Sequence, residues 1–240
     1  MNRLAAVPFF SLIALSLAAC SQEHAPSESI GEAADTVVKE VDGSAPASRP
    51  KGEFAPRDEC GDVEGAEAFR AQLADAVKAR DAHRLLALAA PEVKLDFGGG
   101  SGSGELRSRL ADPAQDLWSE LEALMTLGCA TNREGGITLP WYFEQDLGAR
   151  DPMMSMIVLG EDVPAYATAD PAAKPAGALS WAGVELVGGR MPDRARQEIR
   201  TAEGKKWFIA TDKLRSVIDY RLSAVSRDGK WRITSLIAGD

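Results

Sequence analysis

The chain has 240 residues, of which 45% are hydrophobic and 26% are charged, a composition typical of a globular protein. Its formal net charge is −9, which argues against binding to nucleic acid or directly to anionic lipid headgroups, because both favour basic surfaces. After residue 20 no apolar run is long enough to cross a bilayer, so we expect no membrane-spanning helix in the rest of the chain.

The first twenty residues have the layout of a secretory signal. Arg3 precedes an apolar run over residues 4–15 that is too short for a stable membrane span. The sequence Leu17-Ala18-Ala19-Cys20 resembles the lipobox of bacterial lipoproteins, in which the chain is cut before the cysteine. The resemblance implies a signal peptide over residues 1–19 and lipidation of Cys20, with palmitate among the attached chains. An ordinary signal peptide followed by a chance cysteine is the alternative.

Residues 20–57 are predicted to be the lipidated Cys20 and a disordered tether. This segment is rich in Ser, Ala, Pro, Glu and Gly, so it cannot bury enough apolar surface to offset its ordering entropy. In many Gram-negative bacteria, lipoproteins with Ser after the cysteine tend to go to the outer membrane. Ser21 therefore favours an outer-membrane lipoprotein whose body faces the periplasm, with surface exposure and the inner membrane left open.

The cysteine count predicts a disulfide. If lipid takes Cys20, the two remaining cysteines are Cys60 and Cys129, and a pair in an exported protein is typically oxidised. Closing a loop of about 70 residues would stabilise the fold by roughly 4 kcal/mol. Two free thiols are an alternative, and a metal site is disfavoured because the chain has only two histidines, His24 and His83. We predict no metal and no cofactor.

The folded body begins near residue 60 with two helices. Three apolar residues recur at intervals of four and predict a helix over residues 67–80: Phe69, Leu73 and Val77. Asp81 is a typical N-cap and predicts a second helix over residues 82–90, which Pro91 ends. The alternation of apolar and polar residues over 93–97 predicts a strand.

The middle of the chain is punctuated by glycine and proline. Residues 98–104 are glycine-rich and predict a flexible connector, since no Lys-Ser or Lys-Thr follows the last glycine as a phosphate loop requires. Asp112-Pro113 predicts the start of a helix that ends at Gly128. Residues 137–143 are a predicted strand that Pro140 places at a sheet edge.

From residue 153 onward the pattern is β. Strands are predicted over residues 156–159, 179–187 and 207–210, and a final hairpin turns at Asp228-Gly229. One face of this hairpin is predicted to face the core: Tyr220, Leu222, Ala224, Trp231, Ile233 and Ile237. The other face is mostly basic: Arg221, Val225, Arg227, Lys230 and Arg232.

Residues 157–216 resemble a bacterial SH3 (SH3b) domain. The matching order is Val158 to Val163, a loop over 167–175, residues 177–187, and a hairpin over 197–210 around Glu203-Gly204. The chain departs from the family in the longer loop 190–196 and in Trp207-Phe208-Ile209, where a glycine-aromatic-valine triplet is usual. The resemblance implies a small β-barrel over residues 151–217 that binds peptidoglycan peptides or a protein partner. Four residues are the candidate ligand contacts: Tyr166, Trp181, Trp207 and Phe208.

Residues 69–97 and 230–233 resemble the opening and the last strand of an NTF2-like or cystatin-like α+β domain. The resemblance implies a split domain over residues 58–150 plus 218–240, interrupted by the SH3-like segment. A sequential arrangement of a helical and a β region is also open. The expected fold class is therefore α+β, with helices plus an antiparallel sheet and a small SH3-like β-barrel, inserted or sequential.

These features favour a non-enzymatic envelope lipoprotein whose body binds a cell-wall component or an envelope protein, with no nucleic-acid partner. No catalytic residue is predicted: the chain has no Gly-x-Ser-x-Gly and no His-Glu-x-x-His, and His83 is expected to lie exposed at the start of a helix. One alternative is an NTF2-like pocket for a small ligand, which requires a hollow cone. Another is an acidic inhibitor of basic wall-degrading enzymes.

Overall fold

The computed structural model describes residues 51–148 and 150–239. The lipobox, Cys20 and almost all of the predicted tether lie outside the described residues, so lipidation and localisation stay predictions. No helix within the described ranges has the length and apolarity that a bilayer span needs.

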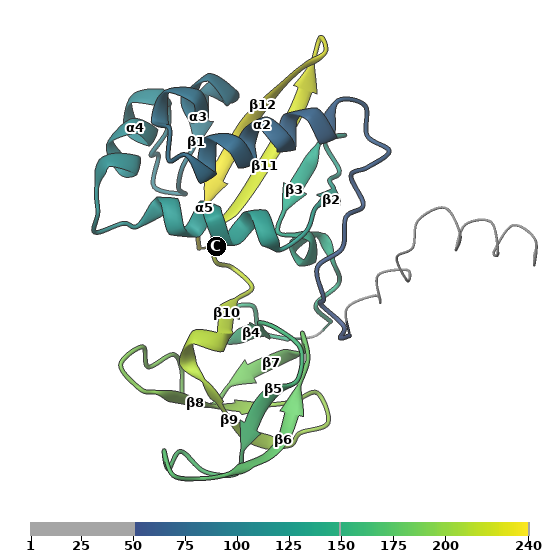
Figure 1. The fold of residues 1–240 in the computed structure, drawn as a ribbon, viewed down its shortest axis with the longest axis vertical. Coiled ribbons are helices and arrows are strands. Elements are labelled where there is room, and N and C mark those ends of the chain that lie inside the picture. The colour runs from purple at the N-terminus through teal and green to yellow at the C-terminus, as the bar shows by residue number, and fades with distance from the viewer. Residues whose placement is uncertain (1–50, 149, 240) are drawn as a thin grey trace, which may run out of the picture. The chain divides into compact units, whose positions relative to one another are not determined.

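The described residues form an α+β fold with helices and two sheets (Figure 1). The α-helices of this part of the chain are α2 Ala66–Lys78, α3 Ala82–Leu88, α4 Ser103–Ala111 and α5 Leu117–Thr126, and its 3-10 helices are η1 Trp141–Glu144 and η2 Thr211–Lys213. The first sheet has the strand order β1-β12-β11-β3-β2 and is made of β1 Ala89–Lys94, β2 Ala130–Thr131, β3 Ile137–Leu139, β11 Arg221–Arg227 and β12 Lys230–Ile237. The second sheet has the order β10-β4-β7-β8-β9-β5-β6 and is made of β4 Ser155–Val158, β5 Val163–Tyr166, β6 Pro175–Leu179, β7 Gly183–Leu186, β8 Arg196–Arg200, β9 Lys206–Ala210 and β10 Leu214–Ser216.

The first two helices confirm the prediction from their apolar spacing and cap. In α2 the predicted stripe is buried, and the Asp81 carboxylate accepts a hydrogen bond from the backbone N–H of Arg84 at 3.0 Å, as an N-cap does. The second helix is shorter than predicted, because β1 begins at Ala89 and contains Pro91. Proline is tolerated there since β1 is an edge strand of the first sheet.

The glycine-rich connector leads into α4, a helix that the sequence reasoning missed. Two leucines at a spacing of four, Leu106 and Leu110, are buried and hold residues 103–111 in helical form. Asp112 ends this helix, so the predicted helix start at Asp112-Pro113 is wrong and α5 begins only at Leu117. The predicted end is confirmed, since Gly128 follows α5 with a φ of +78°, which glycine adopts readily.

Pro140 ends a strand rather than marking a sheet edge. The strand β3 stops at Leu139, the Leu139-Pro140 peptide is cis, and residues 141–144 continue as η1. Since the proline lies outside the ladder, its missing N–H does not prevent β3 from pairing on both sides, with β11 and β2.

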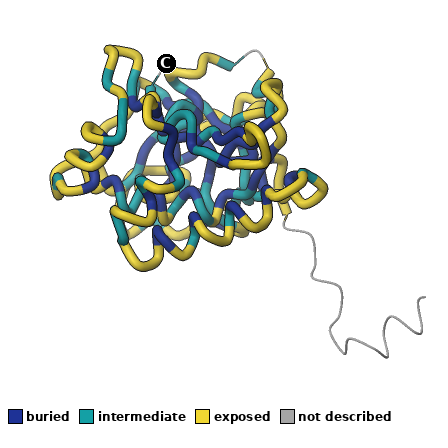
Figure 2. Tube along the Cα trace, turned by 90° about the horizontal axis from the view of Figure 1, so that it is seen from above, coloured by how far each residue is buried: buried dark blue, intermediate teal, exposed yellow. Residues whose placement is uncertain are grey.

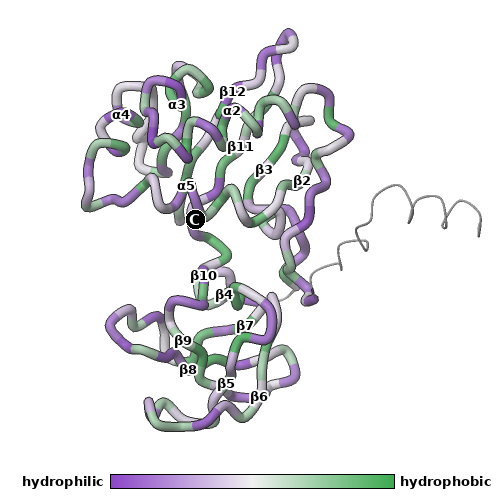
Figure 3. Tube along the Cα trace, in the orientation of Figure 1, coloured by the Kyte–Doolittle hydropathy of each residue, from purple (hydrophilic) through white to green (hydrophobic). Residues whose placement is uncertain are grey.

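The last hairpin turns at Asp228-Gly229 as predicted, and its tip is hydrophilic (Figure 3). A bulge between Ser223 and Ala224 changes the predicted register. It places Leu222 opposite Leu236, so Leu236 joins the core in place of Ile237, which was wrongly assigned to that face.

The four α-helices cover one face of the first sheet, and an apolar cluster fills the space between them (Figure 1). We call the part formed by residues 61–139 and 220–239 the α+β body. Phe69 and Trp231 stack across it with ring centroids 5.6 Å apart. Buried positions lie in the interior, and exposed ones lie on the loops and on the outward sides of the helices (Figure 2). The interior expected to be hollow in a small-ligand carrier is filled by packed apolar side chains.

The second sheet belongs to residues 155–216, which lie between β3 and β11 in the sequence; we call residues 154–217 the β body. Its seven strands form a row whose ends, β10 and β6, are not paired with each other, so the expected small SH3-like barrel is not shown. The predicted hairpin is present, with β8 and β9 paired over five residues. The core of this body is apolar: Met156, Val158, Val163, Ala165, Val184, Leu186, Ile199, Trp207, Ile209 and Leu214.

A third apolar cluster joins residues of both bodies: Phe54, Leu127, Ala130, Trp141, Tyr142, Ile157 and Val217. Residues 51–60, which we call the strap, supply Phe54 to this cluster. The backbone N–H of Phe54 donates to the carbonyl of Trp181 at 2.9 Å, and that of Glu59 donates to the carbonyl of Cys129 at 2.8 Å. The strap is therefore hydrogen-bonded to both bodies.

Candidate functional site

Two of the four predicted ligand residues lie together on the β body. Tyr166 and Phe208 pair across β5 and β9, and both are partly exposed. The guanidinium carbon of Arg196 lies 3.4 Å from the centroid of the Tyr166 ring, a cation–π contact that covers part of this aromatic pair.

The other two predicted residues lie elsewhere. Trp207 is 8% exposed and packs in the core of the β body, because it alternates with Phe208 along β9 and points to the opposite face. Trp181 lies in a turn with a φ of +42° and packs against the third cluster. The structure thus brings Tyr166 and Phe208 together and separates Trp207 and Trp181 from them.

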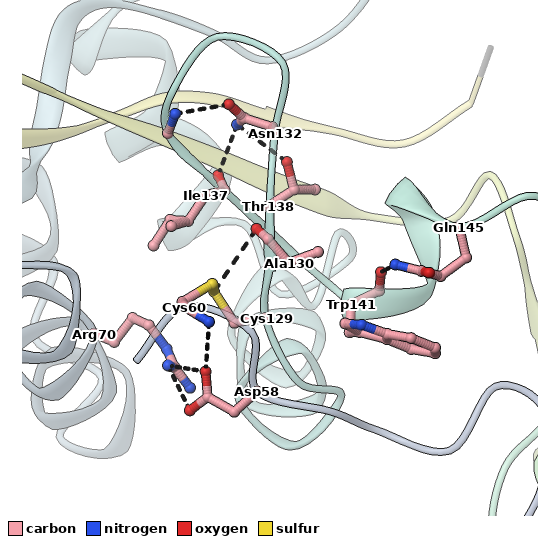
Figure 4. The surroundings of a disulfide bond; sticks show 11 residues. Asp58, Cys60, Arg70, Cys129, Ala130, Asn132, Ile137, Thr138, Trp141 and Gln145 are labelled. Atoms are coloured by element: carbon pink, nitrogen blue, oxygen red, sulfur yellow. Dashed lines mark hydrogen bonds and ion pairs between the residues drawn. A yellow bond between two sulfur atoms is a disulfide. The ribbon is translucent and has the colours of Figure 1, made fainter. Parts of the chain in front are cut away.

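The predicted disulfide is present. Cys60 and Cys129 are joined with their Cα atoms 5.8 Å apart, and both are fully buried (Figure 4). Beside them the Asp58 carboxylate accepts hydrogen bonds from Arg70 at 2.7 Å and from the backbone N–H of Cys60 at 3.1 Å. Partial burial raises the pKa of Asp58, but these hydrogen bonds outweigh it and the pKa is lowered. The disulfide fixes the end of the strap to β2.

A buried cation lies where the two bodies meet. The Arg215 side chain is 7% exposed and forms ion pairs with Glu120 at 3.0 Å and Asp219 at 3.7 Å. Burial disfavours its charge, yet Tyr142 and the two carboxylates raise its pKa above the ordinary value. Burial raises the pKa of Tyr142 to about 12. The two terminal nitrogens of Arg215 are engaged by Glu120, Asp219 and the Tyr220 carbonyl, while its buried Nε has no hydrogen-bond partner among the described residues. We interpret this cluster as structural, because its charges compensate one another.

The outer face of the first sheet, opposite the helices, carries a row of polar side chains. Lys94 pairs with Ser235, Ser235 with Ser223, and Ser223 with Thr138, across β1, β12, β11 and β3. Each has core residues as neighbours along its strand, so these side chains point away from the helices. Because neighbouring strands lie about 4.8 Å apart, successive side chains of this row, which crosses four strands, are spaced at about that distance.

This row lines a groove of about 510 Å³. Its other lining residues are Asn132, Arg133, Glu134, Glu144, Thr234 and Ile237. Asn132 shapes one wall of the groove, because its amide donates to the Ile137 carbonyl at 3.1 Å and to the Thr138 hydroxyl at 3.3 Å (Figure 4). We call this feature the sheet groove.

Aromatic side chains lie at one end of the sheet groove. Arg221, two residues before Ser223 on the same face of β11, has its guanidinium carbon 4.5 Å from the Phe143 ring centroid and 5.6 Å from that of Phe97. Phe97 is 52% exposed, and the Lys94 ammonium lies 4.4 Å from its ring centroid. A large apolar ring is therefore open to solvent beside the row of hydroxyls.

A second depression, of about 470 Å³, lies around Arg150. Arg150 is paired with Glu53 at 3.6 Å and donates to the Leu147 carbonyl at 3.1 Å. Its charge is therefore already compensated by the protein, which makes the sheet groove the stronger candidate.

The sheet groove was missed by the sequence reasoning. Its residues come from distant segments, such as Thr138 and Ser223, which are 85 positions apart, and only the strand pairing brings them together. The sequence of β11 gives a partial signal for the position of the groove. Arg221, Ser223 and Val225 alternate with the core residues of this strand, so they lie on the outer face that was predicted for the hairpin. His83, to which no catalytic role was assigned from the sequence, is exposed on α3 and does not line the groove.

No protein-family model matches the chain, and no curated protein matches it. Among solved structures, a designed NTF2-like protein is 11% identical, over 73% of this chain and 97% of that chain, with a TM-score of 0.28. A likeness of this size carries no argument about fold or function, so the proposals below depend on the residues alone.

Proposed function

We propose that this chain is a non-enzymatic envelope lipoprotein that binds a cell-wall component through the sheet groove. Lipid on Cys20 would anchor it to the outer membrane. The predicted tether, shortened to residues 21–50 because residues 51–57 belong to the strap, would let the body reach a partner in the periplasm. The α+β body would be NTF2-like and the β body a divergent SH3-like insertion. The observation that carries the proposal is an open groove lined by polar side chains, among them the hydroxyls of Ser223 and Ser235, on interior strands of the first sheet.

The alternatives receive less support from the geometry. A small-ligand carrier of the NTF2-like type would need space between helices and sheet, where packed apolar side chains lie. An acidic inhibitor of basic enzymes would need an anionic surface, but the sheet groove is lined by both Lys94 and Arg133 and by Glu134 and Glu144. An envelope protein as the partner is kept as an outcome of the test.

Co-sedimentation of the purified, detergent-solubilised full chain with peptidoglycan sacculi tests the proposal. We expect the wild type to sediment with sacculi and Ser223→Arg, which fills the groove, to lose most of this binding. Ser108→Arg on the exposed surface of α4 is the matched control and should bind like wild type. Tyr166→Ala, on the β body, should also retain binding.

If the wild type does not sediment with sacculi, the proposal of a cell-wall partner is wrong. If the wild type instead captures an envelope protein that Ser223→Arg does not capture, the groove binds a protein. Anchoring is tested separately: Cys20→Ala should abolish palmitate incorporation and release the protein from the outer-membrane fraction. Palmitate incorporation by Cys20→Ala would contradict the assigned lipidation site.

A further inference from the structure

We infer that the sheet groove binds a neutral glycan strand, with its hydroxyl row contacting the sugar hydroxyls and Phe97 packing against a sugar ring. This inference rests on the proposed function, because it names the part of the wall that the groove would recognise. Four properties of the described residues lead to a polyhydroxylated ligand.

The first property is the state of the hydroxyls. Within residues 51–148 and 150–239, the side chains of Ser223 and Ser235 make no hydrogen bond to the protein, whereas the Thr138 hydroxyl accepts one from Asn132. A serine hydroxyl both donates and accepts, which is also the character of a sugar hydroxyl. Two adjacent free hydroxyls on neighbouring strands therefore suit a ligand that presents hydroxyls in series.

The second property is the position of the groove in the sheet. β11 and β12 are interior strands, so their backbone N–H and C=O groups are used in pairing on both sides. An extended peptide binds a sheet by adding a strand at an edge, which is not possible at this place. The ligand must instead bond to side chains, as a glycan can.

The third property is the balance of charge. The groove is lined by two cations, Lys94 and Arg133, and two carboxylates, Glu134 and Glu144. A polyanion such as a nucleic acid requires an excess of cations, which this groove does not have. A neutral ligand carries no such requirement, and all four charged groups can hydrogen-bond to its hydroxyls.

The fourth property is the aromatic end. Among the described residues, three large hydrophobic side chains are exposed, and Phe97 is the aromatic one. Lys94, which belongs to the polar row, contacts the Phe97 ring, so this ring lies next to the row. A sugar ring presents C–H groups on its flat faces and hydroxyls on its rim. It can therefore pack against the phenyl ring while its rim reaches Ser235 and Ser223, since aromatic surfaces dominate recognition sites.

The test measures binding of the full-length protein to two soluble wall fragments by isothermal titration calorimetry. One is a peptide-free glycan strand whose lactyl carboxyl groups, which removal of the peptides would leave charged, are capped as neutral amides. The other is the isolated stem peptide. We expect the glycan strand to bind and the stem peptide not to bind. The double variant Ser223→Ala and Ser235→Ala should weaken glycan binding by about tenfold or more, from the loss of two hydrogen bonds.

Phe97→Ala should weaken glycan binding by a similar factor. Met153→Ala, which removes an even more exposed apolar side chain that does not line the groove, should leave it unchanged. If sacculi bind but the peptide-free strand does not, the inference fails while the proposed function stands. It also fails if the serine double variant binds the strand as wild type does. If neither sacculi nor either fragment binds, the proposed function fails as well.

Discussion

Tyr142 illustrates how a single buried group makes stability depend on pH. It is 2% exposed in the third cluster and lies beside Arg215, and burial raises its pKa to about 12 from an ordinary value near 10. Since the folded chain favours the neutral phenol, the associated stability is fully present below pH 10 and is lost as the pH rises through 12.

We therefore expect the free energy of unfolding to fall more steeply between pH 10 and pH 12 in the wild type than in Tyr142→Phe. A shift of two pKa units corresponds to about 3 kcal/mol between the two ends of this range. Urea denaturation at several pH values measures both slopes, and the other groups titrate equally in the two proteins. Parallel slopes would contradict the effect.

At the scale of elements, local signals predicted structure well and non-local ones did not. The cap at Asp81 and the stripe of α2 were predicted because a helix is decided by residues within a few positions of one another. The helix α4 was missed because its two leucines lie between glycines and a strong Asp-Pro signal. The bulge at Ser223 could not be predicted, since it depends on how β11 fits the paired strand β12.

The cap gives a prediction that is independent of the partner. Asp81→Ala removes the acceptor for the Arg84 N–H and should lower the free energy of unfolding by about 1 kcal/mol. Asp81→Asn keeps a capping side chain and should retain most of the stability. Urea denaturation of the three proteins checks this, and an unchanged midpoint in Asp81→Ala would show that the cap contributes nothing.

At the scale of the whole molecule, the disulfide is the feature that the cysteine count predicted correctly, whereas the sheet groove could not be predicted. Counting Cys60 and Cys129 needs only the sequence, but the hydroxyl row needs the pairing of β3, β11, β12 and β1. The aromatic residues singled out in the sequence divide between core and surface for the same reason. The sequence shows that side chains alternate between the two faces of a strand, but it does not show which face packs against the core.

Replacing Cys60 and Cys129 together by alanine should lower the free energy of unfolding by about 4 kcal/mol, because their loop of 69 residues is no longer closed in the unfolded chain. Guanidinium denaturation of the oxidised protein and the double variant measures this difference. Treatment with reductant is the control: it should destabilise the wild type and leave the double variant unchanged. Equal stability of the oxidised protein and the variant would contradict the prediction.

The order of the strands has a consequence for how the protein is made. β12 is the central partner of β1 and β11, yet it begins at Lys230, 136 positions after β1 ends at Lys94, so the first sheet stays incomplete until β12 has been synthesised. Cys60 precedes the start of β12 by 170 residues and Cys129 by 101. Oxidation can therefore join Cys60 to Cys129 while the sheet is still open, which holds α2 and α5 near each other until the final hairpin arrives. Such long-range pairing makes folding slow, and the early covalent link shortens the search.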